Sequence, residues 1–325
     1  MQKNQFDAIA VGDATLDTFL RVKDIVIIPG KEHQNALACV PYGDKVVVDS
    51  FEQQVAGNAA NNAIGSARLG LKSAFYSVVG NDDSGKKVLA AMKREKVSLK
   101  YLRVDRKNPT NYTVVINYNG ERTQLIYRLD RAYTLPKLAK ANWVYYTAVG
   151  KNHVTLEKEI IDYAKESGAK LAFNPGDYQL ARGAKALAPV LKSTSVLFVN
   201  KEEGCKLVGQ RDILDLLHQL SDLGPKIVVV TDGPKGAYAH DSSEAYYMQV
   251  YPVKLVEMTG AGDSFATGFM AALYHGEGIY EALKWGTANS ASVISFVGPQ
   301  KGLLTKKGMK QMLVRFKNIK PKKIS

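Results

Sequence analysis

One aspartate stands in a run of small residues where a phosphoryl-transfer site could form. Residues 259–265 read Thr-Gly-Ala-Gly-Asp-Ser-Phe and open a predicted helix over 266–274. Small residues let a ligand approach the backbone, and the free amides and dipole of a helix start attract an anion. The negative charge of Asp263 would repel a phosphate, so this residue is unsuited to be a simple phosphate ligand. It suits instead a base that takes the proton of an attacking hydroxyl. The alternative is that Asp263 caps the helix.

A second run of small residues lies near the front of the chain. Residues 57–63 read Gly-Asn-Ala-Ala-Asn-Asn-Ala, and Gly57 again permits close approach of a ligand. Asn58 and Asn61 are three residues apart and share one face of a predicted helix. Amide side chains donate and accept hydrogen bonds, which suits a ligand with many hydroxyls. A helix cap followed by tight packing is the alternative interpretation.

Two carboxylates follow the first predicted strand, in the segment 12–17 that reads Gly-Asp-Ala-Thr-Leu-Asp. Ligands of open α/β sheets bind beyond the carboxyl ends of strands. A carboxylate such as Asp17 at that place can hold two hydroxyls of a sugar. A turn or a helix cap is the alternative for either aspartate.

Residues 80–87, Gly-Asn-Asp-Asp-Ser-Gly-Lys-Lys, are similar to a phosphate-binding P-loop but do not match it. The last position is Lys87, so the hydroxyl that would bind magnesium is missing. Asp82 and Asp83 would also set negative charge against phosphate. We therefore expect a loop in which an aspartate or serine caps the next helix.

The elements that must position these residues alternate between short apolar runs and helical segments. Strands are predicted at 6–11, 74–79, 143–147, 170–173, 196–199 and 227–231, with helices between them, among them 59–69 and 84–96. Strands separated by helices indicate an α/β fold with a parallel sheet covered on both faces.

Two stretches without helices interrupt this order and predict a small separate sheet. Residues 21–55 contain β-prone pieces, and residues 111–128 alternate around Asn119-Gly120, a strong hairpin signal. The core would then comprise 1–20, 57–110 and 129–325, and the accessory sheet 21–56 and 111–128. Exposed edges of such a sheet favour a homodimer, and a monomer with charged edges is the alternative.

Composition excludes several classes of protein. The chain has 325 residues, 46% hydrophobic and 23% charged, which is typical of a globular protein. It has no apolar run long enough for a membrane span and no signal peptide. Its two distant cysteines favour a reducing cytoplasm. The net charge is +13, and the basic residues are scattered along the chain except for a cluster in the tail. We therefore expect the chain to bind an anionic small molecule, or simply to have a basic surface, rather than to bind nucleic acid.

Four motifs in order resemble the ribokinase-like (PfkB) family of carbohydrate and nucleoside kinases over nearly the whole chain. Besides the segments at 56–70 and 259–265, Asn200-Lys-Glu-Glu203 is similar to the family's Asn-x-x-Glu motif, and residues 231–236 to its nucleotide-contacting turn. The resemblance implies a three-layer αβα sandwich with a mostly parallel central sheet and a small β lid.

The resemblance also implies a role for each motif. Asp263 would be the catalytic base, and Asn200 and Glu203 would organise Mg²⁺ and phosphate, largely through water. The amides expected to form the anion hole for the γ-phosphate of ATP are those of Gly260, Ala261 and Gly262. The residues expected at the nucleotide are Thr231, Gly233, Gly236 and, near the adenine, Asn289. The residues expected to hold the acceptor are Asp17, Gly57, Asn58 and Asn61. The lid would close over the acceptor and exclude water.

The chain departs from the family pattern at three places. Asn58-Ala59 stands where ribokinases have Gly-Lys-Gly, and Thr15 stands where an asparagine is expected. Glu257 replaces an aspartate that helps to hold a monovalent cation. Ribose as the acceptor and activation by potassium are therefore left open. The opening typical of phosphosugar kinases is also missing, so an acceptor that is not yet phosphorylated is expected.

The sequence thus predicts an ATP-dependent kinase that phosphorylates a hydroxymethyl group of a small sugar. A nucleoside is the alternative acceptor, because tyrosines of the lid region could stack on a base: Tyr42, Tyr112, Tyr118 and Tyr127. A ligand-binding relative without catalysis is the alternative of another class.

Overall fold

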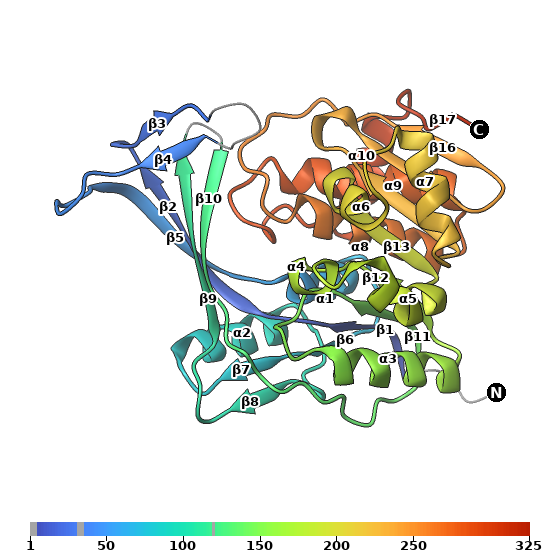
Figure 1. Cartoon of the computed structure of the whole chain (residues 1–325), viewed down its shortest axis with the longest axis horizontal. Helices are drawn as coiled ribbons and strands as arrows, with labels where there is room; N and C mark the ends of the chain where they lie inside the picture. Colours follow the sequence, from blue (N-terminus) through green and yellow to red (C-terminus); the bar gives the residue numbers. More distant parts are fainter. Residues whose placement is uncertain (1–4, 31–35, 119–120) are drawn as a thin grey trace.

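A nine-stranded sheet forms the centre of the computed structural model, which describes residues 5–30, 36–118 and 121–325 (Figure 1). In spatial order its strands are β17 (Lys322–Lys323), β16 (Ala245–Met248), β15 (Ala237–His240), β14 (Ile227–Thr231), β13 (Val196–Asn200), β12 (Lys170–Phe173), β11 (Ala141–Tyr146), β1 (Phe6–Val11) and β6 (Ser73–Tyr76). All pairs from β14 to β6 are parallel, and β15 to β17 are antiparallel. The predicted mostly parallel sheet is confirmed.

Helices cover both faces of this sheet. One face carries α1 (Asn58–Arg68), α2 (Asp83–Arg94), α8 (Ala261–Tyr274), α9 (Ile279–Val293) and α10 (Lys306–Arg315). The other carries α3 (Val154–Ser167), α4 (Asp177–Leu180), α5 (Gly183–Ser193), α6 (Lys201–Val208) and α7 (Ile213–Asp222). The predicted three-layer sandwich is therefore confirmed. No helix among the described residues is long and apolar enough to cross a membrane.

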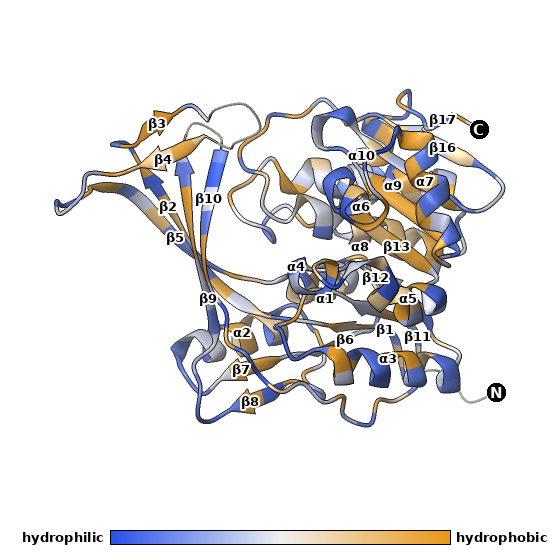
Figure 2. Ribbon diagram, in the orientation of Figure 1, coloured by the Kyte–Doolittle hydropathy of each residue, from blue (hydrophilic) through white to orange (hydrophobic). Residues whose placement is uncertain are grey.

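The central strands are apolar on both sides because each side packs against a helical layer. In β14, Val229 belongs to the core of one face, and Val228 and Val230 belong to the core of the other. Figure 2 shows the same pattern as hydrophobic strands between helices whose outer sides are hydrophilic. Continuous apolar runs are typical of parallel strands buried on both faces, which explains why the runs predicted these strands.

A second sheet of four strands stands beside the sandwich, and we call it the lid sheet (Figure 1). Its order is β10 (Glu121–Tyr127), β9 (Asn111–Tyr118), β2 (Thr15–Val22) and β5 (Val48–Ala56). The expected hairpin is present as the antiparallel pair β9–β10, although its turn at 119–120 lies outside the described residues. The predicted boundary after residue 20 was wrong, because β2 begins at Thr15 and already pairs with β5 and β9.

Two short pairs of strands complete the described chain. β3 (Val26–Ile28) pairs with β4 (Leu37–Cys39), and β7 (Val78–Gly80) pairs with β8 (Arg103–Asp105). The predicted strand at 74–79 is thus divided between β6 and β7, which belong to different sheets. In the loop that is similar to a P-loop, Asp82 accepts a hydrogen bond from Gly85 N at 2.8 Å. This confirms that an aspartate of that loop caps α2.

Candidate active site

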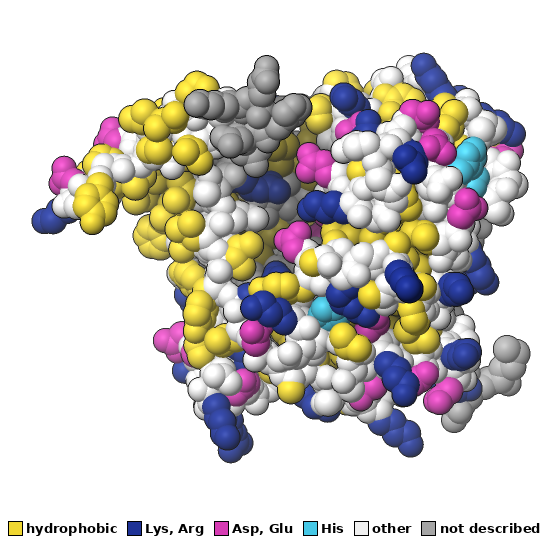
Figure 3. Space-filling view, in the orientation of Figure 1, with side chains coloured by type: hydrophobic (Ala, Val, Ile, Leu, Met, Phe, Trp, Pro, Cys, Tyr) yellow, Lys and Arg dark blue, Asp and Glu magenta, His cyan; other side chains and the backbone are white. Residues whose placement is uncertain are grey.

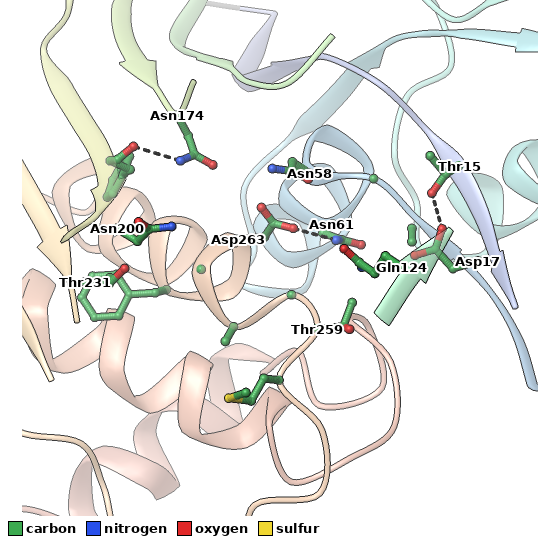
Figure 4. Close-up of a pocket in the computed structure, with 18 of the residues that line it drawn as sticks. Thr15, Asp17, Asn58, Asn61, Gln124, Asn174, Asn200, Thr231, Thr259 and Asp263 are labelled. Carbon is green, nitrogen blue, oxygen red and sulfur yellow. Dashed lines mark hydrogen bonds between the residues drawn. The ribbon is translucent and has the colours of Figure 1, made fainter. Parts of the chain in front are cut away.

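A polar cavity of about 310 Å³ lies between the carboxyl ends of the parallel strands, the start of α8 and the lid sheet. Asn174, Asn200 and Thr231 reach it from the ends of β12, β13 and β14. Figure 4 shows Asp263 between two groups of side chains, with Asn200 and Thr231 on one side and Asp17 on the other. The predicted convergence of motifs from distant parts of the chain is therefore present in the structure.

Asp263 occupies the first turn of α8 and is buried. The helix begins after Gly260, and no side chain caps it. The Asp263 carboxylate instead accepts a hydrogen bond from Asn61 Nδ2 at 2.8 Å, across from α1 (Figure 4). Because its carboxylate lines the cavity and accepts from Asn61 rather than from the helix backbone, Asp263 does not act as the helix cap.

The surroundings of Asp263 favour a proton acceptor that works near neutral pH. Burial raises the pKa of Asp263 to about 6, although the hydrogen bond from Asn61 and the charge of Arg122 lower it. A carboxyl group with a pKa near 6 is mostly ionised at pH 7 and is a stronger base than an exposed aspartate.

Asn61 has a second partner that fixes its orientation. Gln300 Nε2 donates to Asn61 Oδ1 at 3.1 Å, so that one amide links Gln300 to the Asp263 carboxylate. Asn61 was predicted to hold the acceptor, and it lines the cavity, but both ends of its amide are engaged within the protein. Gln300 was not predicted, because it lies outside every motif and is distant from Asn61 in the sequence.

Backbone amides at the start of α8 face the same cavity. Gly260 has a φ of +78°, and a Cβ there would lie 2.4 Å from Pro299 Cβ, so the turn requires glycine. A Cβ at Gly262 would meet no atom within 4 Å, which leaves its backbone accessible to a ligand. The predicted amide of Ala261 is already engaged, because Ala261 N donates to Met258 O at 3.2 Å. Of the three amides expected to form the anion hole, that of Ala261 is therefore hydrogen-bonded within the protein.

Asn200 and Glu203 form a capping box at the start of α6, a role that was not predicted. Glu203 N donates to Asn200 Oδ1, and Asn200 N donates to Glu203 Oε2, both at 2.8 Å. Both residues also line the polar cavity. Burial raises the pKa of Glu203, and the charges of Asp177 and Asp263 add to the rise. A nearby cation would offset this concentration of negative charge.

An apolar cavity of about 660 Å³ adjoins the polar one at the start of α8. Thr231, Gly233 and Gly236, which were expected at the nucleotide, line this cavity. Its remaining wall is mostly hydrophobic and includes Pro234, Val250, Tyr251, Pro252, Val253 and Leu255. Flat apolar groups such as a nucleotide base fit a cavity of this kind.

Asn289, which was expected near the adenine, does not line this cavity as the described residues form it. Its side chain is fully buried, where it donates to Ser264 O at 2.7 Å and accepts from Leu304 N at 2.9 Å. Asn289 thus ties α9 to α8 and to the chain before α10. The neighbouring residues Thr287 and Ser290 line the cavity in its place.

Asp17 lies on the lid sheet, at the opposite side of the polar cavity from the nucleotide residues (Figure 4). Thr15 Oγ1 donates to Asp17 Oδ1 at 2.5 Å. Burial raises the pKa of Asp17 to about 6, and the negative charges of Glu257 and Asp263 contribute to the rise. Hydrogen bonds from the hydroxyls of Thr15 and Thr113 lower the pKa and partly offset this effect. Of the other residues predicted at the acceptor, Gly57 and Asn58 also line the cavity.

Alternate residues of β10 and the residue after it form a further wall that was not predicted. They are Arg122, Gln124, Ile126 and Arg128. Successive residues of a strand point to opposite sides, so the alternation of the hairpin would have indicated this face. Arg122 Nη1 lies 3.5 Å from Glu257 Oε1, a carboxylate that also accepts from Thr259 N at 2.7 Å.

Residues 22–306 match the family described as pfkB family carbohydrate kinase. The chain belongs to this family. It is a sugar kinase, and phosphoryl transfer is the activity that its relatives share. The expectation drawn from the four motifs is confirmed.

Individual members of the pfkB family resemble the chain along most of its length. It is 27% identical to the 5-dehydro-2-deoxygluconokinase of Bacillus subtilis over 96% of this chain and 97% of that one. It is 26% identical to the ATP-dependent 6-phosphofructokinase of Thermoanaerobacterium thermosaccharolyticum over 79% and 84%. Arabidopsis thaliana ribokinase, solved with ribose and ATP, shares the fold with a TM-score of 0.78 and 20% identity over 95% and 98%.

Proposed function

We propose that this sugar kinase transfers the γ-phosphate of ATP to a hydroxymethyl group of a small sugar, with Asp263 as the general base. The observation that carries the proposal is the position of Asp263, which lines the polar cavity directly after Ala261 and Gly262, two residues that this cavity shares with the apolar one. A sugar suits the polar cavity and an adenine suits the apolar cavity, so the reacting hydroxyl and the γ-phosphate would meet at the start of α8.

The chain's own groups account for the steps of this transfer. Asp17 and Asn58 bind hydroxyls of the sugar and turn its hydroxymethyl group toward Asp263. Asn61 holds the Asp263 carboxylate in place, and that carboxylate takes the hydroxyl proton as the oxygen attacks phosphorus. The accessible amide of Gly262 and the positive end of the α8 dipole stabilise the negative charge of the transferring group.

Magnesium fits the residues at the end of β13. Mg²⁺ is usually held by one or two carboxylates together with phosphate oxygens and water. Glu203 offers such a carboxylate, since only its Oε2 atom belongs to the capping box. Bound there, Mg²⁺ would neutralise phosphate charge, while Asn200 keeps the Glu203 side chain oriented. A monovalent cation has no support of this kind, because Arg122 lies against Glu257.

The nucleoside alternative rested on tyrosines of the lid region. Tyr112 donates or accepts a hydrogen bond with Thr18, and Tyr42 and Tyr127 are exposed. None of the four candidate tyrosines lines the polar cavity as the described residues form it. Stacking on a base therefore finds no support, and a sugar is the acceptor that we propose.

A panel of sugars and nucleosides, assayed for ADP release in the presence of Mg²⁺, tests this function. We expect turnover with at least one sugar and none with nucleosides at equal concentration. Turnover with nucleosides alone would overturn the choice of acceptor. ATP binding without turnover of any acceptor would instead support a ligand-binding relative without catalysis.

We propose that the lid sheet closes on the acceptor. Asp17 and the wall formed by β10 belong to this sheet, so a bound sugar adds contacts to it and stabilises it. Trypsin should therefore cleave within 21–56 and 111–128 several-fold more slowly when the acceptor is present. Cleavage at Lys306 and Lys310 on α10 is the internal control. Equal cleavage of the lid segments with and without the acceptor would contradict the proposal.

We also propose that two copies associate through the lid. Figure 3 shows hydrophobic side chains gathered over β3, β4 and β5, away from the sandwich. The exposed ones include Val26, Leu37, Tyr42, Val47 and Phe51. An exposed apolar cluster of this kind marks a surface for a protein partner.

Introducing a charge at this apolar cluster tests the association. Phe51 is 71% exposed, and we expect Phe51→Asp to convert a dimer into a monomer in sedimentation velocity. Val314→Asp is the matched control, because Val314 is 70% exposed and belongs to α10 of the sandwich rather than to the lid sheet. A monomeric native protein at micromolar concentration would disprove the association.

A further inference from the structure

Arg128 brings a positive charge to the wall of the acceptor cavity. It is the first residue after β10 and lines the polar cavity together with Asp17 and Asn58. Only 20% of its side chain is exposed, so the guanidinium is largely removed from water. A cation in such a place costs free energy unless charged or polar partners surround it.

The protein orients Arg128 without fully occupying its donors. Arg128 Nε lies 3.2 Å from Asp13 Oδ2, and the guanidinium carbon lies 5.8 Å from the centre of the Tyr178 ring. Both Arg128 Nε and Asp13 Oδ2 are nevertheless buried without a hydrogen-bond partner among the described residues. Asp13 Oδ1 accepts from the hydroxyl of Tyr133 at 2.8 Å. Asp13 thus balances the charge of Arg128, and the planar N–H groups of the guanidinium are left for a ligand.

The register of the lid sheet places Arg128 within reach of a sugar bound by Asp17. Asp17 pairs with Thr113, and Thr113 pairs with Ile126, so these three residues form one row across the sheet. Arg128 follows Ile126 by two residues, directly after the end of β10, and lines the same cavity. Two residues of a strand span about 7 Å, a distance that the long side chain of arginine covers.

We infer that the acceptor carries an oxyanion, a carboxylate or a phosphate, at the end away from the hydroxyl that is phosphorylated, and that Arg128 binds this group. This inference rests on the proposed sugar kinase activity and names the class of sugar. Guanidinium pairs bidentately with carboxylate and phosphate oxygens, which gives both affinity and orientation. A neutral sugar would leave these donors of Arg128 without an equivalent partner.

Arg122 does not offer the same site. It lies six residues earlier on β10, which is about 20 Å along an extended strand. Its guanidinium faces Glu257 and lowers the pKa of Asp263, so it belongs to the phosphoryl end of the cavity. One small acceptor cannot use both arginines for the same anionic group.

A matched panel of acceptors tests the inference on the native enzyme. It contains a neutral sugar, the corresponding sugar acid and the corresponding phosphosugar, each with a hydroxymethyl group to phosphorylate, and ADP release is measured. We expect kcat/KM to be about 10- to 100-fold higher for one of the charged sugars, as for a charge-assisted hydrogen bond. The sugar acid and the phosphosugar arms identify which oxyanion is bound.

Variants at Arg128 then assign the preference to this side chain. Arg128→Gln should abolish the preference by raising KM for the charged sugar while KM for ATP stays the same. Because that change leaves Asp13 buried without its counter-charge, the double variant Asp13→Asn with Arg128→Gln is measured beside it. Lys151→Gln is the matched control, since Lys151 Nζ lies 5.7 Å from the same Tyr178 ring but does not line the cavity.

The outcomes separate this inference from the proposed function. A native enzyme that prefers the neutral sugar, or a charge preference that survives in both Arg128 variants, would overturn the inference while the sugar kinase activity stands. An enzyme that phosphorylates no member of a broad sugar panel would instead overturn the proposed function. Loss of the preference in the Lys151→Gln control would also count against Arg128 as the binding group.

Discussion

Asp263→Asn is expected to lower turnover by about 10²- to 10⁴-fold, which is the usual contribution of a general base. Asparagine has nearly the same shape, and the buried position of Asp263 beside Asn61 gives no reason for a loss of ATP or acceptor binding. Equilibrium binding of both ligands and single-turnover kinetics would measure the two effects separately. A variant with nearly full turnover would show that the carboxylate accepts no proton.

The pH dependence of the native enzyme provides a second measurement of the same group. Burial raises the pKa of Asp263 to about 6, so the proton-accepting form is lost as the pH falls through 6. We expect kcat/KM to decrease below that pH and to level off above it. Asp17, whose pKa burial also raises to about 6, titrates in the same range and makes the decrease steeper. Asp263→Asn should leave only the contribution of Asp17.

Asp17→Ala is expected to raise KM for the acceptor by about 10- to 100-fold, which corresponds to the loss of hydrogen bonds to a charged group. KM for ATP should change little, because Asp17 lines the polar cavity and not the apolar one. The measurement is steady-state kinetics with each substrate varied in turn, together with thermal denaturation to verify folding.

A second carboxylate provides the control for Asp17. Asp83 lies at the start of α2 with 89% of its side chain exposed, and it lines neither cavity. We therefore expect Asp83→Ala to leave both KM values unchanged. An equal rise of both constants in the Asp17 variant would show that Asp17 supports the fold of the cavity rather than the acceptor.

Continuous runs of apolar residues predicted the strands of the central sheet. This criterion missed a strand that contains several polar residues. The predicted strands at 6–11, 170–173 and 227–231 coincide with β1, β12 and β14, since strands buried on both faces carry few polar residues. Residues 15–22 instead mix polar and apolar side chains, without either a continuous apolar run or a strict alternation. Thr15 and Asp17 line the cavity, so β2 resembles a loop in composition although it is one of the two inner strands of its sheet.

The motifs indicated which residues meet at the site but not what each side chain does there. Asn61 holds Asp263, the proposed base, through a contact that spans 202 residues, and Asn289, expected near the adenine, instead connects two helices. Both are buried asparagines whose partners belong to other elements of the fold, so the spacing within each motif could not identify those partners. Arg128 escaped prediction for a related reason, because its proximity to Asp17 depends on the register of β10, β9 and β2.

The division of the site between two sheets has a consequence for how such an enzyme can evolve. The base and the phosphate-binding amides that we propose belong to α8, whereas the lid strands β2, β9 and β10 form the cavity wall that carries Asp17 and ends at Arg128. Substitutions on these three strands can change the sugar without altering the catalytic helix. We therefore expect that exchanging cavity-facing residues of the lid sheet between relatives transfers acceptor preference and leaves the chemical step intact.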